Sequence, residues 1–275
     1  MRCVPVRTHS KTGYMITLAE IKKPYAQELH AHEGFLMREY LQYRVLGIIF
    51  SSPFAEKLVF LGGTCLRIVH GNRRFSEDID FDNLGLTKPE FAQVGNLVKQ
   101  ELEREGYTVT AEMAGLSALR CRVRLPGLLF HHGLTGHKDQ TVLIQLDTEP
   151  QGYAYEPEPW YLARWDVRQD IRCCPLPLLL SQKCHAILDR KRAKGRDFFD
   201  VSFLLGLNAE PDMRYLQEKT GLNTTQELAD ALLERCAQLD MEAMATDVEK
   251  FLFDANGRLG VTRFPQLIQQ HWLRP

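Results

Sequence analysis

The sequence lacks the features that mark several large classes of protein. Its seven cysteines are scattered and include no C-x-x-C pair, which is typical of reduced thiols in a cytoplasmic protein rather than of a disulfide framework. Its apolar runs fall far below the ~20 residues that cross a bilayer, and its first residues show no signal-peptide pattern. We therefore expect a soluble, cytoplasmic protein with no role at a membrane.

The chain also lacks an excess of charge of either sign. Its formal net charge is −1 over 275 residues, with 44% hydrophobic and 25% charged residues, which is close to the average for soluble globular proteins. This composition excludes disorder as the dominant state, and it provides no overall basic field that would attract nucleic acid. Any nucleic-acid-binding role must depend on a local basic patch.

The spacing of apolar residues predicts an α+β fold in two parts. Helical spacing over residues 17–50 is followed by a short apolar run, Leu58–Leu61, which indicates a buried strand ending in Gly62-Gly63. After Pro175 and Pro177 the spacing is helical to about residue 252. We expect a mixed sheet with flanking helices in residues 1–174 and a helical domain in residues 175–275. Further strands are expected at 78–81, 107–113, 118–125, 141–147 and 167–173, helices at 64–70 and 88–106, and turns near Gly195, at residues 206–208 and near Gly221.

Acidic residues alternate along one short segment, residues 74–82. In an extended chain Asp78 and Asp80 share a face with Arg74, Ser76 and Asp82, while the aromatic and aliphatic residues between them point inward. Two carboxylates placed so close repel each other, and burial without a partner is costly. A divalent cation removes that conflict, because Mg²⁺ takes oxygen ligands and completes its shell with water and substrate phosphates.

Two neighbouring features strengthen a metal and phosphate site. Gly62-Gly63 opens an expected helix, where glycines allow close approach of a phosphate and the helix N-terminus offers free N–H groups; an ordinary tight turn explains the same pair. Asp147 ends an apolar strand, and with Asp78 and Asp80 it would form a carboxylate triad able to hold two ions. Taken alone, an acid such as Asp147 is more often a plain strand-end residue.

Two motifs resemble those of a known enzyme family. Residues 60–67 followed by Arg73-Arg74-Phe75-Ser76-Glu77-Asp78-Ile79-Asp80-Phe81 are similar to the first motif of the AbiEii/AbiGii-type toxin nucleotidyltransferases, in the DNA polymerase β-like nucleotidyltransferase superfamily. The spacer between Gly63 and Asp78 is long for the superfamily, but the Arg-x-Ser-x-Asp-x-Asp-Phe ending is specific to the toxin branch. Lys183-x-x-Ala-x-x-x-Arg190 followed by Arg196-Asp-x-x-Asp200 resembles a later motif. The resemblance covers residues 60–205.

The resemblance implies a fold, a reaction and roles for individual residues. The fold would be the nucleotidyltransferase type, and the reaction a metal-dependent transfer of a nucleoside monophosphate from an NTP, with release of pyrophosphate. Asp78, Asp80 and, by position only, Asp147 would bind Mg²⁺ or Mn²⁺. Gly62, Gly63 and Ser76 would face the triphosphate, and Lys183 would neutralise its charge. Asp197 would act near the nucleotide or hold Lys183 and Arg190. For Lys183 a solvated position, and for Arg196, Asp197 and Asp200 an interhelical salt bridge, are the structural alternatives.

The family further implies the toxin of a toxin-antitoxin system, with a cognate antitoxin and an RNA acceptor, often the 3′ end of tRNA. The sequence offers a basic segment that would bind an RNA backbone, formed by Arg190, Lys191, Arg192, Lys194 and Arg196. A second basic strip is expected on one strand face, at Arg120, Arg122 and Arg124. A solvated helix end explains the first segment equally well.

Other functions remain open at this stage. The same chemistry would serve a protein or small-molecule acceptor, and a nucleotide-binding partner without catalysis would retain parts of the site. The joint presence of Asp78, Asp80, Lys183 and Asp197 argues against a catalytically silent protein. No sequence feature identifies the preferred nucleotide.

Overall fold

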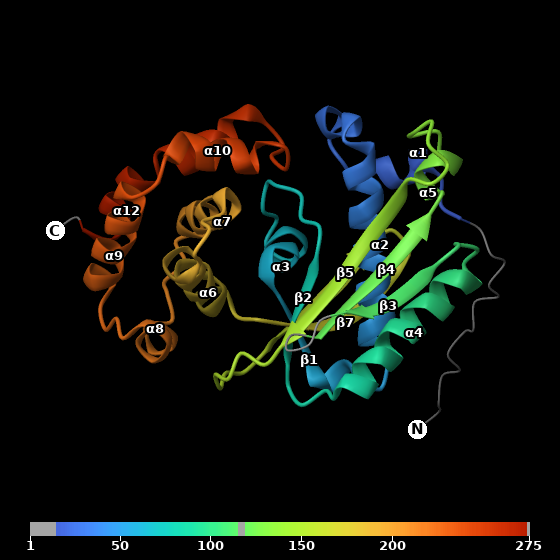
Figure 1. The fold of residues 1–275 in the computed structure, drawn as a ribbon, viewed down its shortest axis with the longest axis horizontal. Coiled ribbons are helices and arrows are strands. Elements are labelled where there is room, and N and C mark those ends of the chain that lie inside the picture. The colour runs from blue at the N-terminus through green and yellow to red at the C-terminus, as the bar shows by residue number, and fades with distance from the viewer. Residues whose placement is uncertain (1–14, 115–118, 274–275) are drawn as a thin grey trace, which may run out of the picture.

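A computed structural model describes residues 15–114 and 119–273. It shows an α+β protein in which a sheet and its covering helices form one side and a cluster of helices the other (Figure 1). The sheet has seven strands in the order β3-β4-β5-β2-β1-β7-β6. Its strands are β1 (Leu58–Leu61), β2 (Ile79–Asn83), β3 (Thr110–Ala114), β4 (Leu119–Pro126), β5 (Thr141–Glu149), β6 (Glu158–Arg164) and β7 (Val167–Cys173).

The sheet is mixed, because β1 runs parallel to β7 and β2 parallel to β5, whereas the other pairs are antiparallel. Its helical partners on the N-terminal side are α1 (Leu18–Lys22), α2 (Glu33–Phe50), α3 (Gly62–Ile68), α4 (Lys88–Arg104) and the short α5 (Leu128–His131). The helical side holds α6 (Leu176–Asp189), α7 (Gly195–Gly206), α8 (Met213–Thr220), α9 (Thr225–Ala237), α10 (Met241–Glu249), α11 (Arg258–Thr262) and α12 (Phe264–Trp272).

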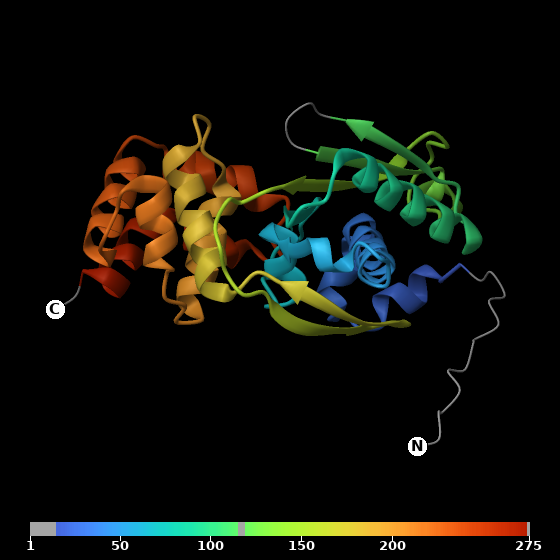
Figure 2. The same cartoon turned by 90° about the horizontal axis from the view of Figure 1, so that it is seen from below.

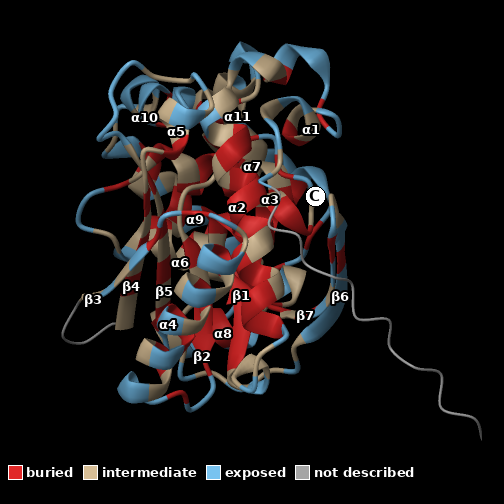
Figure 3. Cartoon of the chain, turned by 90° about the vertical axis from the view of Figure 1, so that its right-hand side faces the viewer, coloured by how far each residue is buried: buried red, intermediate tan, exposed pale blue. Residues whose placement is uncertain are grey.

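The core lies between the sheet and α2, around which the sheet curves (Figure 2). Helix α2 is apolar along most of its length and is buried on nearly all sides, as is β1 beside it (Figure 3). In β4 the residues alternate: Cys121 and Val123 are buried, and Cys121 meets α4 at Gly95, while the arginines between them are half-buried on the other face. One face of this part of the sheet therefore supports the core and the other is available to a ligand.

Most predicted elements are present, with some differences. The strand Leu58–Leu61 is found as predicted, and the fold class is confirmed. The turn predicted near Gly195 is present, because α6 ends at Asp189 and α7 begins at Gly195, where a side chain would collide with the carbonyl of Met244. The sheet ends at Cys173, and α6 begins at Leu176. Within the described residues no helix combines the length and apolar character that crossing a bilayer requires.

Candidate active site

The turn from β1 into α3 brings its backbone close to the side chains of Asp80, Arg74 and Ser76. Gly62 has a φ of +80°, and a Cβ on it would collide with the carboxylate of Asp80. A Cβ on Gly63 would lie 2.6 Å from the guanidinium of Arg74 and 3.0 Å from Oγ of Ser76. Both positions therefore require glycine, one for its conformation and both for space.

Asp78 and Asp80 approach this turn from the adjacent strand β2 and the residue before it. Asp80 lies on β2 opposite Leu61, and Asp78 immediately precedes the strand, where Thr64 donates to its backbone carbonyl. Among the described residues neither carboxylate makes a hydrogen bond or ion pair. Burial, together with Asp78 and Asp147, raises the pKa of Asp80 to about 6 against the opposing effect of Lys183. Burial and Asp147 also raise the pKa of Asp78. The pair is an anionic site with no counter-charge in hydrogen-bond contact among the described residues.

Asp147 has a different environment from the other two predicted ligands. It lies beside Asp80 in the parallel β2–β5 pair, but its carboxylate accepts from Nε of Arg120 at 2.6 Å and from Gln145 at 2.9 Å. It does not line the cleft described below. Across the described ranges, the His, Cys, Asp and Glu side chains form no group of three arranged around a metal position. The structure thus brings Asp78 and Asp80 together and leaves Asp147 paired beside them.

The extended face predicted for residues 74–82 is only partly present. The strand begins at Ile79, so Arg74 and Ser76 belong to the preceding loop. Asp82 does not reach the cleft: it is 2% exposed and accepts hydrogen bonds from the backbone N–H of Gln151 and from the hydroxyl of Tyr155. It anchors the segment after β5 rather than contributing a free carboxylate.

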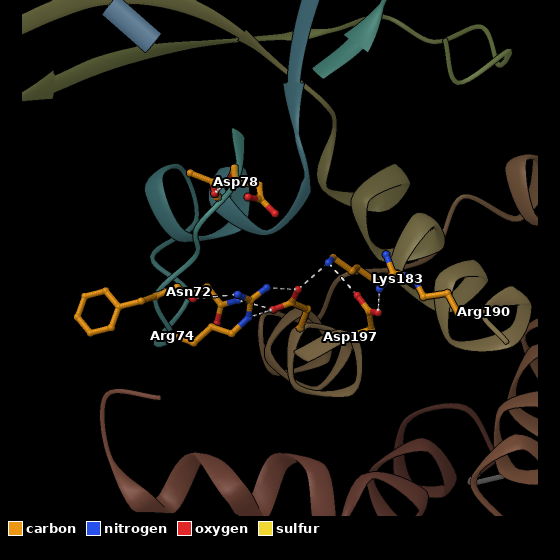
Figure 4. Close-up of polar contacts among 9 residues, drawn as sticks. Asn72, Arg74, Asp78, Lys183, Arg190 and Asp197 are labelled. Atoms are coloured by element: carbon orange, nitrogen blue, oxygen red, sulfur yellow. Dashed lines mark hydrogen bonds and ion pairs between the residues drawn. The ribbon is translucent and has the colours of Figure 1, made fainter. Parts of the chain in front are cut away.

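A buried ion network faces the turn from the helical side. Asp200 on α7 receives Nε and Nη2 of Arg74 at 2.7 and 2.6 Å and Nζ of Lys183 at 2.8 Å. Lys183 on α6 also donates to Asp197 at 3.1 Å, and Arg190 pairs with the other oxygen of Asp197. Figure 4 shows these contacts running from Asn72 and Arg74 to Arg190. Arg74 and Lys183 lower the pKa of Asp200 to about 2 despite its complete burial. Asp197 and Asp200 therefore form the interhelical salt bridges that were one alternative for them, and Lys183 pairs with both.

Several residues that hold this site gave no clear signal in the sequence. Gln42, buried in α2, donates to the backbone carbonyls of Ser76 and Glu77, both at 3.0 Å; a polar residue inside an apolar helix was its only sign. Segment 251–253 forms a β-bridge with the loop before β2, in which Phe75 donates to the carbonyl of Phe251 at 2.8 Å. The ring of Phe75 also stacks on Phe35. Nothing in the local sequence marks the 251–253 segment as part of the site.

These elements enclose a cleft of about 380 Å³ between the sheet and the helical side. The predicted catalytic and phosphate-facing residues line it, together with two residues of the basic segment: Gly62, Gly63, Ser76, Asp78, Asp80, Lys183, Asp197, Arg190 and Arg196. Lys191 and Arg192 are exposed outside it, and Lys194 is half-buried. Burial and the nearby Arg196 and Arg190 lower the pKa of Lys194.

On the arginine face of β4, two of the three side chains are engaged. Arg120 pairs with Asp147, and Arg124 pairs with Glu112 at 2.5 Å. Arg122 lies opposite Gln145, two residue pairs along from Arg120, and makes no ion pair or hydrogen bond in the part of the chain that the structure describes. Only this arginine of the strip has an uncommitted guanidinium.

Comparison with solved structures gives similar folds at low sequence identity. MenT4, a nucleotidyltransferase toxin from Mycobacterium tuberculosis, is 15% identical over 93% of this chain and 90% of its own, with a TM-score of 0.56. JHP933 from Helicobacter pylori is 19% identical over 86% of this chain and 92% of its own, with a TM-score of 0.49. No curated protein matches the chain in sequence.

The comparison with protein families is specific. The model of the family described as nucleotidyl transferase AbiEii toxin, type IV toxin-antitoxin system, matches residues 44–269. This range includes every residue of the cleft and also the 251–253 segment that holds the loop before β2. The chain belongs to the AbiEii family and is a toxin nucleotidyltransferase of a type IV toxin-antitoxin system.

Proposed function

We propose that this toxin transfers a nucleoside monophosphate from an NTP to a hydroxyl group of an RNA acceptor, with the 3′ end of tRNA as the favoured acceptor. The acceptor oxygen bonds to the α-phosphorus, the bond from that phosphorus to the bridging oxygen of the β-phosphate breaks, and pyrophosphate leaves while the hydroxyl proton passes to solvent. The observation that carries the proposal is the pair of unpartnered carboxylates, Asp78 and Asp80, in one cleft with Lys183 and the Gly62-Gly63 turn.

Mg²⁺ or Mn²⁺ fits the carboxylate pair. Burial and neighbouring carboxylates raise the pKa of both Asp78 and Asp80, and a divalent cation held between them would remove that cost. Asp147 would join them as a third ligand only by giving up Arg120, its present ion-pair partner. When bound, such ions neutralise the phosphate oxygens at which negative charge develops.

The chain's own residues prepare the rest of the phosphate site. Gly62 and Gly63 leave room for phosphate against the start of α3, and the hydroxyl of Ser76 faces the same space. Around Lys183, three cations meet two carboxylates, so this network carries one net positive charge beside the cleft. A positive charge fixed before the substrate arrives stabilises a phosphoryl-transfer transition state without further rearrangement.

For the acceptor we propose the exposed part of the basic segment. Lys191 and Arg192, which are exposed, and the half-buried Lys194 follow Arg190 of the cleft lining in the chain, and their charges suit an RNA backbone. The uncommitted Arg122 on the open sheet face is a second contact of the same kind.

The direct test of this function offers the enzyme several classes of acceptor and asks which of them becomes labelled. The toxin is incubated with each of the four α-labelled NTPs, with Mg²⁺ or Mn²⁺, and with total RNA, purified tRNA or total protein. We expect label in RNA of tRNA size at its 3′ end, and none with Asp80→Asn. Label in protein alone would replace the RNA acceptor with a protein, and no label in any fraction would contradict the proposed transfer.

A further inference from the structure

Arg196 is the one cation of the cleft wall that no carboxylate holds. Four arginine and lysine side chains line the cleft. Arg74, Lys183 and Arg190 each form an ion pair with Asp197 or Asp200. Arg196 forms neither an ion pair nor a hydrogen bond with any residue that the structure describes. Its guanidinium, with five N–H donors in a planar fork, is free to bind a ligand.

The backbone at Arg196 is fixed although its side chain is free. The preceding residue, Gly195, donates its N–H to the carboxylate of Asp247 at 2.9 Å and is packed against Met244 without room for a Cβ. The following residue, Asp197, is 1% exposed and is held by Lys183 and Arg190. A residue anchored on both sides presents its side chain from a rigid position, which lowers the entropy lost on binding.

Arg196 is half-buried and lines the cleft that holds Asp78 and Asp80. Arg196 lies in the first turn of α7, whose N-terminal end carries a partial positive charge. Burial raises the pKa of both Asp78 and Asp80, and the charge of Arg196 opposes that rise in each of them. Lys191 and Arg192, in the same basic segment, are exposed and outside the cleft. The basic segment therefore has one part inside the cleft, with Arg196, and one part on the exposed surface, with Lys191 and Arg192.

We propose that Arg196 binds the triphosphate of the nucleotide substrate and belongs to the nucleotide site, not to the acceptor surface. A guanidinium matches two phosphate oxygens at once. Glu149 and Asp189 also line the cleft but neither pairs with Arg196 among the described residues, and the triphosphate is the anion that the proposed reaction brings into it. The inference rests on the proposed nucleotidyl transfer, and it assigns one part of that site.

The test separates phosphate binding from RNA binding. Affinity for inorganic tripolyphosphate with Mg²⁺ is measured by calorimetry, and affinity for tRNA without nucleotide by mobility shift, for the full chain and its variants. Arg196→Gln should weaken tripolyphosphate binding at least tenfold and leave tRNA affinity within twofold. Arg196→Lys should recover part of the loss, since it restores the charge without the planar fork. Arg263→Gln, which removes an exposed guanidinium elsewhere on the helical side, should change neither affinity.

Two outcomes would overturn the inference. One is a folded Arg196→Gln variant that binds tripolyphosphate like the unmodified chain; the other is a loss confined to tRNA affinity. Because Arg196 has no partner among the described residues, its replacement should leave the melting temperature unchanged. If Arg196→Gln does lower the melting temperature, the same two affinities are compared for Arg196→Lys. If the unmodified chain transfers nucleotide while Arg196→Gln keeps full tripolyphosphate affinity, only this inference fails. If the unmodified chain neither binds tripolyphosphate nor transfers nucleotide, the proposed function fails with it.

Discussion

Asp80, half-buried in the cleft wall, and Asp200, fully buried behind it, belong to one site, yet their pKa values move in opposite directions. Burial raises the pKa of Asp80 to about 6, whereas Arg74 and Lys183 lower that of Asp200 to about 2. Asp200 has its counter-charges within the protein, and Asp80 has none in hydrogen-bond contact. The difference teaches that one half of the cleft is completed by folding, while the other half is left for a ligand to complete.

The largest expected effect comes from the incomplete half. Asp78→Asn or Asp80→Asn should reduce transfer by a factor on the order of 10³ or more, because each removes a charge needed to hold the cations. The fold should remain, since neither side chain has a partner to lose in the described structure. Initial rates with saturating NTP, together with a circular dichroism spectrum, measure both. Near-normal rates in either variant would mean that the pair is not the metal site.

In the completed half, the network around Asp200, the largest effect should be on the free energy of unfolding. Asp200→Ala leaves the guanidinium of Arg74, which is 1% exposed, buried without its partner, and breaking a buried pair in this way costs about 3–5 kcal/mol. Urea unfolding measures the loss. The control is Arg73→Ala, which removes the neighbouring exposed guanidinium from its pair with Asp254, where we expect less than about 1 kcal/mol. Equal effects in the two variants would contradict the distinction drawn here between a buried network and a surface pair.

The opposite pKa shifts predict opposite dependences of stability on pH. A raised carboxyl pKa means that the folded state binds the proton more tightly, so stability without metal should fall as the pH rises from about 4 to 6, by at most about 3 kcal/mol for Asp80. Asp200 contributes stability that is present above about pH 4 and is lost as the pH falls towards 2.

Asp80→Asn isolates the first of these two effects. At pH 8 without metal, this variant should be more stable than the unmodified chain, and Mg²⁺ should stabilise the unmodified chain but not the variant. Unfolding free energies at pH 4, 6 and 8, with and without Mg²⁺, provide the check. A variant that is less stable at pH 8 would show that the Asp80 carboxylate is satisfied within the protein.

Lys183 joins the two halves and should show an intermediate effect. Lys183→Ala should weaken NTP binding and slow transfer by about 10²-fold, since it removes a fixed positive charge and leaves Asp197 and Asp200 with fewer partners. Lys183→Arg should recover only part, because the planar guanidinium is larger than the ammonium group. Steady-state kinetics in NTP distinguish these outcomes. Unchanged kinetics in both variants would leave Lys183 with a structural role alone.

The smallest effect is expected outside the cleft. Replacing Lys191, Arg192 and Lys194 together by Ala should weaken RNA binding and reduce the slope of log affinity against log salt by about 2, because each lost phosphate contact releases fewer counterions. Transfer at saturating RNA should change little. Binding measured at several salt concentrations gives the slope. The same slope in the triple variant would favour a protein or small-molecule acceptor.

The sequence predicted the incomplete half better than the completed one. The strand Leu58–Leu61, the glycine turn and the alternating acids Asp78 and Asp80 follow from local patterns, because spacing along one chain decides which side chains share a face. Strand β6 was not predicted, since its exposed Trp160 and Tyr161 do not produce a clear alternation of buried and polar residues.

The completed half depends on contacts between distant parts of the chain. The pairing of Arg74 with Asp200 joins residues 126 positions apart, and the bridge between the loop before β2 and Leu252 has no local signal. Likewise, spacing placed Arg196 in one basic segment with Arg192, and only the packing of Gly195 against α10 turns it into the cleft. Local patterns reveal which charges are present, and tertiary packing decides which of them remain unpaired.

The central claim is that this cleft transfers a nucleoside monophosphate by means of the unpaired carboxylates. The most direct measurement supplies the same NTP labelled at either the α- or the γ-phosphate, with tRNA and Mg²⁺, to the unmodified chain and to Asp80→Asn. The account predicts α-label in the tRNA, γ-label in released pyrophosphate in equal amount, and neither product with Asp80→Asn. Transfer of the γ-label to the acceptor, or equal transfer of the α-label by Asp80→Asn, would contradict it.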